Sequence, residues 1–233
     1  MDEMKTVARP FGVGITLRFA LMALAVMTSV SALAQPDPKS APILQKSAAI
    51  YKAMKSIEAQ FSYTLENTAA KVKDTQTGSL LLQGAKFKLK IMGQVVQTDG
   101  TVVHTLMDDA KEMQLKSMED FRAETDLDPT TIFTAYEKGY KNKYVEETTV
   151  KGKKAHVIDL FPEDPGKKPF SRLRLTIDAA SSQIISSKTF NKDGSTFTIE
   201  VTKQTPNATV AADAFKVDLA ALKAKGYEVV DLR

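Results

Sequence analysis

A strict two-residue alternation in the middle of the chain constrains its fold more than any other feature. Three lysines, Lys86, Lys88 and Lys90, alternate with Phe87, Leu89 and Ile91. Successive side chains of a strand point to opposite faces, so this segment predicts a strand with one apolar face and one cationic, hydrated face. The apolar face must then be covered by other parts of the protein or by a ligand.

The same alternation recurs along most of the chain. Further strands are predicted at 61–65, 78–82, 102–107, 112–115, 140–150, 155–161, 172–177, 183–190, 196–201 and 228–232. Glycine-containing turns such as Asp99-Gly100, Lys151-Gly152 and Asp193-Gly194 separate neighbours. Short turns favour antiparallel pairing, so we expect a mainly antiparallel sheet of about nine to eleven strands.

Helical spacing is seen in two longer segments. Apolar residues recur every three or four positions between residues 41 and 58, which predicts an amphipathic helix there. Asp128-Pro129 is typical of a helix start and predicts a second helix carrying Ile132, Phe133 and Tyr136 on one side, with a third, short helix near the C-terminus. The predicted fold is therefore mainly β, a strongly curved sheet with two or three helices covering its concave side. Whether the remaining apolar surface is filled by the protein's own side chains or by an apolar ligand stays open.

The first 34 residues predict a cleaved secretory signal peptide. Lys5, Arg9 and Arg18 precede the apolar run 19–30, and Ala32-Leu33-Ala34 gives the small-x-small pattern of a cleavage site after Ala34. The apolar run is shorter than the roughly 20 residues that span a bilayer, which disfavours an uncleaved anchor. Residues 35–233 contain no long linker or repeat and are predicted to form a single domain.

Composition and spacing argue against most kinds of chemistry. The chain has no cysteine, which excludes disulfides and thiolate sites, and a net charge of +4 over 233 residues is too weak to indicate nucleic-acid binding. His104 and His156 lack metal-ligand spacing, and we expect both to be half-exposed strand residues. We predict no metal, no cofactor, no catalytic residue and no enzymatic activity. An enzyme acting on a lipid or glycan is the least favoured alternative.

One region resembles a known family at motif level. The segment Gly78–Lys90, with its glycine, strand, small loop and strand, is followed by Asp99-Gly100, a further strand and Met107-Asp108-Asp109. This order is similar to the signature of the outer-membrane lipoprotein carrier proteins, the LolA-like proteins. The chain departs from the family pattern at Leu81, where a Trp is usual, and at Gly84-Ala85, where a basic residue and Pro are usual.

The resemblance implies an open half-barrel with helices as a lid and a periplasmic location. Its apolar cavity would take the acyl chains of a lipoprotein from an inner-membrane lipoprotein-releasing transporter and deliver them to an outer-membrane acceptor, with the carrier as a monomer. We expect Leu80, Leu82, Phe87, Leu89 and Ile91 to line that cavity.

One alternative to a carrier and one question about surface charge remain at the level of sequence. A non-enzymatic periplasmic sensor or protein-binding module could have the same architecture, with a filled interior. The lysine stripe at 86, 88 and 90 and the pair Arg172 and Arg174 are typical of solvated strand faces, but on one outer face they could meet an acidic partner or anionic headgroups.

Overall fold

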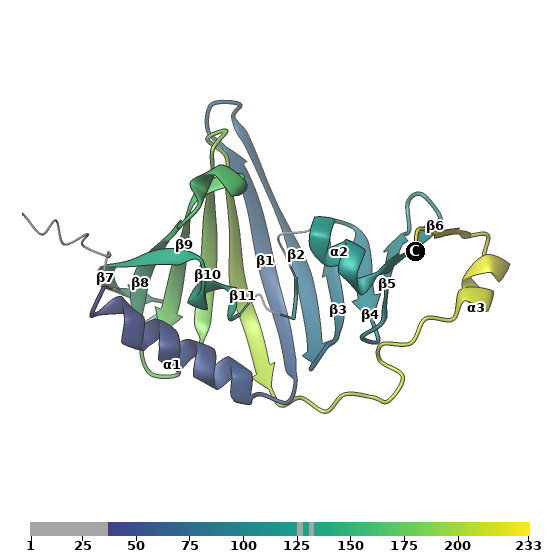
Figure 1. Ribbon diagram of the computed structural model, residues 1–233, viewed down its shortest axis with the longest axis horizontal. Coiled ribbons are helices and arrows are strands. Elements are labelled where there is room, and N and C mark those ends of the chain that lie inside the picture. Colours follow the sequence, from purple (N-terminus) through teal and green to yellow (C-terminus); the bar gives the residue numbers. More distant parts are fainter. Residues whose placement is uncertain (1–36, 125–127, 131–132) are drawn as a thin grey trace, which may run out of the picture. The chain divides into compact units, whose positions relative to one another are not determined.

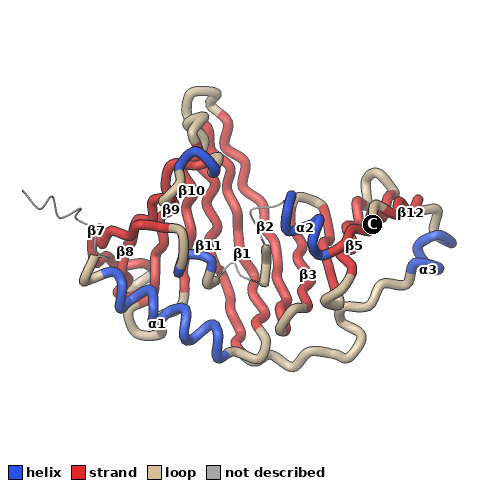
Figure 2. Tube along the Cα trace, in the orientation of Figure 1, coloured by secondary structure: helices blue, strands red, loops and turns tan. Residues whose placement is uncertain are grey.

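The computed structural model describes residues 37–124, 128–130 and 133–233, all within one compact unit that spans residues 34–233 (Figure 1). The predicted signal peptide, residues 1–34, lies outside the described residues. The described part is built on one large sheet with short helices on it (Figure 2). None of its helices is both long and apolar enough to cross a membrane.

Twelve strands make up this sheet. They are β1 (Ile57–Asn67), β2 (Val72–Gln83), β3 (Lys86–Ile91), β4 (Gln94–Thr98), β5 (Val102–Met107), β6 (Glu112–Ser117), β7 (Tyr140–Val150), β8 (Lys153–Pro162), β9 (Phe170–Asp178), β10 (Ile184–Asn191), β11 (Thr196–Pro206) and β12 (Glu228–Asp231). Their order is β12-β6-β5-β4-β3-β2-β1-β11-β10-β9-β8-β7. Since β12 and β7 lie at opposite edges, the sheet is open. Only β12 and β6 are parallel among these neighbours.

Five helical segments accompany the sheet. They are α1 (Ser40–Ala53), α2 (Met118–Glu124), α3 (Leu219–Ala224) and the 3-10 turns η1 (Ala135–Glu137) and η2 (Pro165–Lys167). Figure 1 shows α1 across the strands β8 to β11 and α2 in front of β3 and β4. The two helices therefore cover different parts of the same face.

Alternation along β1 shows why this face is the inner one. Ile57, Ala59, Phe61 and Tyr63 are buried, whereas Glu58 and Gln60 between them are exposed. The antiparallel register continues the buried rows into the neighbouring strands, for example from Ala59 to Leu80. The core cluster formed in this way extends from β4 and β5 across to β8 and packs under α1. We call this side of the sheet the core face and the opposite side the outer face.

The predicted fold class is confirmed, as are the bounds of β3, β5 and β7. The sheet has one strand more than the upper limit we expected, because β4 is a separate strand between Gly93 and the Asp99-Gly100 turn. The short C-terminal helix and last strand also occur where they were predicted.

The first predicted helix is too long. It ends at Ala53, because Met54 has an extended backbone with ψ of 128°, and Ile57 already belongs to β1. Ile57 continues the helical spacing of the preceding segment and also starts the alternation of the strand. Burial on the core face decides in favour of the strand.

The prediction of a long second helix from Asp128 is wrong for the described residues. Asp128 accepts hydrogen bonds from the backbone nitrogen and the hydroxyl of Thr130, 2.8 and 2.7 Å away, which forms a turn. In the part of this segment that the structure describes, only Ala135–Glu137 is helical, as a 3-10 turn. Ile132 lies outside the described residues. The helix that covers β3 is instead α2, which the sequence analysis did not predict.

Candidate functional site

The five residues predicted to line a cavity lie together on the core face. Leu80, Leu82 and Phe87 are 4%, 8% and 0% exposed and belong to the core cluster, while Leu89 and Ile91 are partly buried and pack against it. Leu80 lies directly opposite Leu89 and Leu82 opposite Phe87 in the β2–β3 register. All five therefore lie on one apolar face, and their role as a cavity lining stays a prediction.

Helix α2 covers the β3 side of this face. It begins after Ser117, whose hydroxyl accepts a hydrogen bond from the backbone nitrogen of Asp120 and so caps the first turn. The ring of Phe121 lies 6.0 Å from the ring of Phe87, measured between centroids. Neither Phe121 nor Met118 is fully buried, although both pack against the core cluster. The covering at this end is therefore incomplete within the described residues.

Helix α1 is fixed to the other side of the core face through Tyr51. Its hydroxyl accepts a hydrogen bond from the backbone nitrogen of Ile184 on β10 and donates one to the side-chain oxygen of Gln204 on β11. Its ring stacks on Phe133 with 4.4 Å between centroids. Burial raises the pKa of Tyr51 above its ordinary value, so the hydroxyl stays neutral and available as a donor.

A second tyrosine fastens the same helix. Tyr136 in η1 donates a hydrogen bond of 3.1 Å to the hydroxyl of Ser47. Burial raises the pKa of Tyr136 to about 12. At the N-terminal end of α1, the Ser40 hydroxyl donates to the side-chain oxygen of Asn142 on β7, at 2.6 Å. Polar groups thus tie the helix to β7, β10, β11 and η1, while its apolar side faces the core.

Several apolar side chains of the core face are only partly buried. They come from the helices, from the segment after α2 and from strands on both sides of β1, namely Met118, Phe121, Phe133, Leu89, Ile91, Leu173, Phe197 and Ile199. On the same side, the side-chain nitrogen of Gln204 is buried without a hydrogen-bond partner among the described residues. A surface of this kind can exclude water from an apolar ligand but offers little for covalent chemistry.

The described residues contain no group of three or more His, Asp or Glu side chains that could hold a metal ion. His104 is half-buried, and burial lowers its pKa below the ordinary value, although Asp99 acts in the opposite direction. The half-buried His156 interacts with the hydroxyl of Tyr144 at 3.3 Å. The half-exposed positions predicted for both histidines agree with their surroundings.

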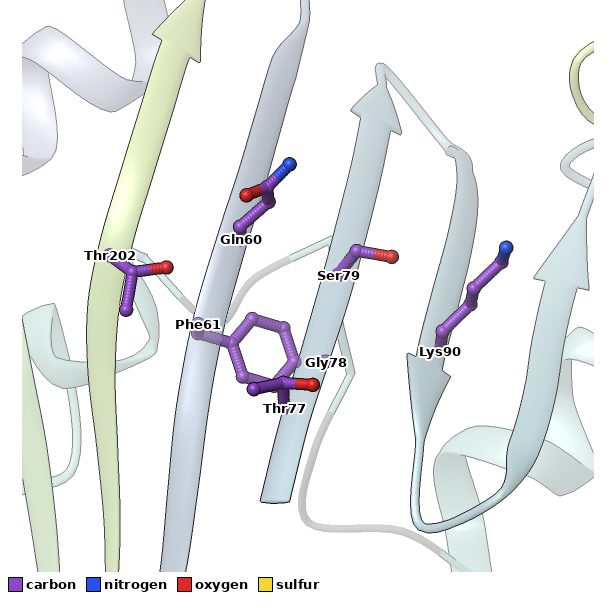
Figure 3. A pocket seen from close by; sticks show the side chains of 7 residues that line it. All are labelled: Gln60, Phe61, Thr77, Gly78, Ser79, Lys90 and Thr202. Carbon is purple, nitrogen blue, oxygen red and sulfur yellow. The ribbon is translucent and has the colours of Figure 1, made fainter. Parts of the chain in front are cut away.

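A separate hollow of about 400 Å³ opens where β11 shifts its register against β1 (Figure 3). Its lining mixes polar and apolar surface, and Figure 3 shows the ring of Phe61 beside Gly78 within it. The lining residues are Gln60, Phe61, Thr77, Gly78, Ser79, Lys90 and Thr202. None of the five predicted cavity residues lines this hollow. One lining residue, Phe61, also belongs to the core cluster.

Sequence reasoning missed the residues that cover the apolar face. Tyr51 was visible as part of a helical stripe, and Phe197 and Ile199 as part of an alternating strand, but their convergence on one surface depends on the strand order. Phe121 lies in a seven-residue helix that is too short to give a clear periodic signal.

Solved structures with a similar fold have low sequence identity to this chain. An uncharacterized conserved protein from Thermus thermophilus is 9% identical, with 83% of this chain and 99% of that chain covered and a TM-score of 0.54. A LolA superfamily protein from Nitrosomonas europaea is 10% identical, with coverages of 76% and 96% and a TM-score of 0.40. The lipoprotein LppX from Mycobacterium tuberculosis is 14% identical, with coverages of 76% and 100% and a TM-score of 0.49. The first of these similarities supports the fold.

Sequence comparison gives the more specific result. No curated protein sequence matches this chain. The sequence pattern of the family described as "Outer membrane lipoprotein carrier protein LolA" matches residues 52–218, which includes every strand of the sheet except β12. This match covers well over half of the chain and agrees with the motif at 78–109 and with the open sheet. The chain belongs to the outer membrane lipoprotein carrier protein LolA family.

Proposed function

We propose that the protein is a periplasmic carrier that shelters the acyl chains of lipoproteins, or of a related lipidic cargo, against the core face of its sheet. Membership of the LolA family supports this proposal. The observation that carries it is the set of partly buried apolar side chains on the core face, including Leu89, Ile91 and Phe197. A contiguous apolar surface that a protein leaves partly open is often a ligand-binding site, and an acyl chain has the right chemistry to cover it.

The energetics favour an apolar cargo. Each methylene moved from water to an apolar surface contributes about 0.8 kcal/mol, so an acyl chain cannot cross an aqueous compartment without shelter. Binding and release require no bond to be made or broken. We therefore propose a carrier without enzymatic activity, in which the side chains of the core face exclude water and α1 and α2 cover the bound chain.

The rest of the proposed pathway follows from this role. Residues 1–34 would direct export and be removed, and residues 35–233 would act as a single carrier domain in the periplasm. An inner-membrane lipoprotein-releasing transporter would supply the cargo, and an outer-membrane acceptor would receive it. The carrier would act as a monomer.

Titration with a fluorescent fatty-acid probe tests the proposal. We expect saturable binding of one probe per chain to protein that was exported and purified from the producing cells. Leu89→Gln should weaken binding about tenfold, because it places a polar amide on the apolar surface. The neighbouring Lys88→Gln is the matched control, since the two residues are adjacent on β3 but face opposite sides of the sheet.

Two results would contradict the proposal. The first is the absence of any saturable probe binding by the folded protein, which would favour a protein-binding module of the same architecture. The second is an equal loss of affinity in Leu89→Gln and Lys88→Gln, which would show that the probe does not use the core face.

A further inference from the structure

The outer face of strands β7 to β10 carries two adjacent rows of cationic and aromatic side chains. Strand register aligns Lys143, Asp159, Arg174 and Lys188 in one row across these four strands. The adjacent row has Lys141 opposite Phe161 and Arg172 opposite Phe190. These eight residues alternate with core-face residues such as Leu160 and Leu173, so their side chains point away from the core. We call these eight residues the outer basic patch.

A buried carboxylate organises the centre of the patch. Asp159 is 4% exposed and accepts two hydrogen bonds from Arg174, at 2.7 and 2.9 Å, and one from Arg172 at 2.9 Å. One carboxylate is thus shared by two guanidinium groups, each about one third exposed in its side chain. The arginines are held in place but only half neutralised, and the remaining N–H groups are open to solvent.

Two phenylalanines accompany these charges. The guanidinium carbon of Arg172 lies 3.8 Å from the ring centre of Phe190, and the ammonium of Lys188 lies 5.5 Å from the same ring. Phe161 is 38% exposed, which places it among the exposed large apolar side chains of the described residues. Lys141 and Lys143 beside it are exposed as well.

The charge of the chain is concentrated here. The outer basic patch holds five cationic side chains and one carboxylate, so its net charge equals the +4 of all 233 residues, and the rest of the chain balances to zero. The next row, which begins with Glu146 on β7, bounds the patch on one side. The outer basic patch therefore has a local excess of positive charge.

We propose that the outer basic patch is a docking surface for membranes rich in anionic phospholipids. Lysines with long apolar stems and an exposed aromatic ring suit the boundary between headgroups and acyl chains. A fluid layer of headgroups requires no fixed geometry, which fits the exposed Lys141 and Lys143. Arg172 and Arg174 share one fixed carboxylate, so the exposed Lys141 and Lys143 supply the mobile charge that suits a fluid layer. This inference goes beyond acyl-chain carriage and can fail independently of it.

Vesicle co-sedimentation of the exported protein tests this proposal. The vesicles contain phosphatidylethanolamine with either the anionic phosphatidylglycerol or the zwitterionic phosphatidylcholine, which has no net charge. We expect binding to the anionic vesicles alone, weakened by salt. The triple variant Lys141→Gln, Lys143→Gln, Lys188→Gln should lose about a hundredfold in affinity, since each lysine near an anionic surface contributes roughly a factor of five. Phe161→Ser, added to the triple variant, should weaken vesicle binding further, because the variant has no aromatic ring at this position to enter the headgroup layer.

The lysine stripe of β3 provides a matched control. Lys86→Gln, Lys88→Gln, Lys90→Gln removes the same three charges from the same face of the sheet, with β2, β1 and β11 between the two sites. We expect this variant to bind anionic vesicles within about threefold of the unchanged protein. Both triple variants should bind the fatty-acid probe normally, which separates this test from that of carriage.

Three results would overturn the proposal. They are a lack of binding to anionic vesicles, an equal loss in the two triple variants, and retention of vesicle binding by the patch variant. If the patch variant loses retention on immobilised polyglutamate while its vesicle binding is unchanged, the occupant is an acidic protein instead of a membrane.

Discussion

At Gly78 the sheet has no room for a side chain. A Cβ atom there would lie 2.5 Å from two ring atoms of Phe61 and 2.6 Å from the backbone oxygen of Lys90. The backbone atom cannot move without disturbing β3, so we expect Gly78→Ala to lower the free energy of unfolding by about 1–3 kcal/mol. Urea denaturation measures this change. Ser79→Ala, one position along on the opposite face, should change it by less than about 0.5 kcal/mol; equal effects would contradict the packing described for Phe61.

The second residue-scale prediction is that Asp159 makes the stability of the fold depend on pH. Burial raises its pKa, but the hydrogen bonds and charges of Arg174 and Arg172 outweigh burial and hold the pKa below the ordinary value. A lowered native pKa stabilises the fold above the unfolded-state pKa of about 4, and this contribution is lost as the pH falls through the native pKa. We expect Asp159→Asn to cost about 1–3 kcal/mol at neutral pH.

The difference between Asp159→Asn and the unchanged protein should therefore shrink as the pH falls below about 4. Urea denaturation from neutral to acidic pH follows this difference. A difference that stays constant over the whole range would show that the carboxylate charge does not stabilise the arginine pair.

At the scale of elements, the Tyr51 hydroxyl is the anchor that joins α1 to β10. Tyr51→Phe would leave the backbone nitrogen of Ile184 without its acceptor, which should cost about 1–3 kcal/mol. Hydrogen exchange at the Ile184 amide should become faster, because the helix is held less firmly over β10. Tyr227→Phe removes a hydroxyl that contacts the exposed side chain of Lys111 and should cost less than about 1 kcal/mol. Unchanged exchange in Tyr51→Phe would contradict the role of this contact.

Elements whose apolar residues follow one spacing, that of a strand or that of a helix, were predictable from the sequence. Elements whose residues fit both spacings were not. The bounds of β3 followed from its lysine alternation, since nothing else in that segment competes with a strand. The region around Ile57 fits both a helix and a strand, and only burial on the core face separates them. Asp128-Pro129 is compatible with a helix start and with a turn, and the hydrogen bonds that Thr130 donates to Asp128 select the turn.

The candidate site was also predictable only in part. Local patterns determine which residues of a hairpin share a face but not where the helices lie. The five residues from Leu80 to Ile91 share a face because alternation fixes parity within a hairpin. The contacts of Tyr51 and Phe121 with this face depend on helix placement, which local periodicity does not determine. The outer basic patch likewise combines Lys143, Asp159 and Lys188 from three strands, and their alignment appears only once the strand order is known.

At the scale of the whole molecule, the C-terminal segment, residues 207–233, covers part of the outer face and adds the edge strand β12. The side-chain nitrogen of Gln97 donates to the backbone oxygen of Lys216 at 3.1 Å, and Phe215 beside it is 6% exposed. The segment then places β12 next to β6, where Met113 and Leu115 are buried. Truncation after Pro206 should lower the free energy of unfolding by at least about 3 kcal/mol and increase binding of a hydrophobic dye.

Removal of Arg233 alone is the control for this truncation, and it should leave both the stability and the dye binding nearly unchanged. If the truncated protein were as stable as the full chain, the C-terminal segment would be an appendage and not a part of the core structure.

The central claim is that the core face carries acyl chains. Native mass spectrometry of the exported protein, purified without detergent from its producing cells, tests this most directly. The account predicts an added mass of a lipid or an acylated protein, which a fatty-acid probe displaces in a one-to-one ratio. A mass equal to that of the polypeptide alone, together with no uptake of the probe, would contradict it.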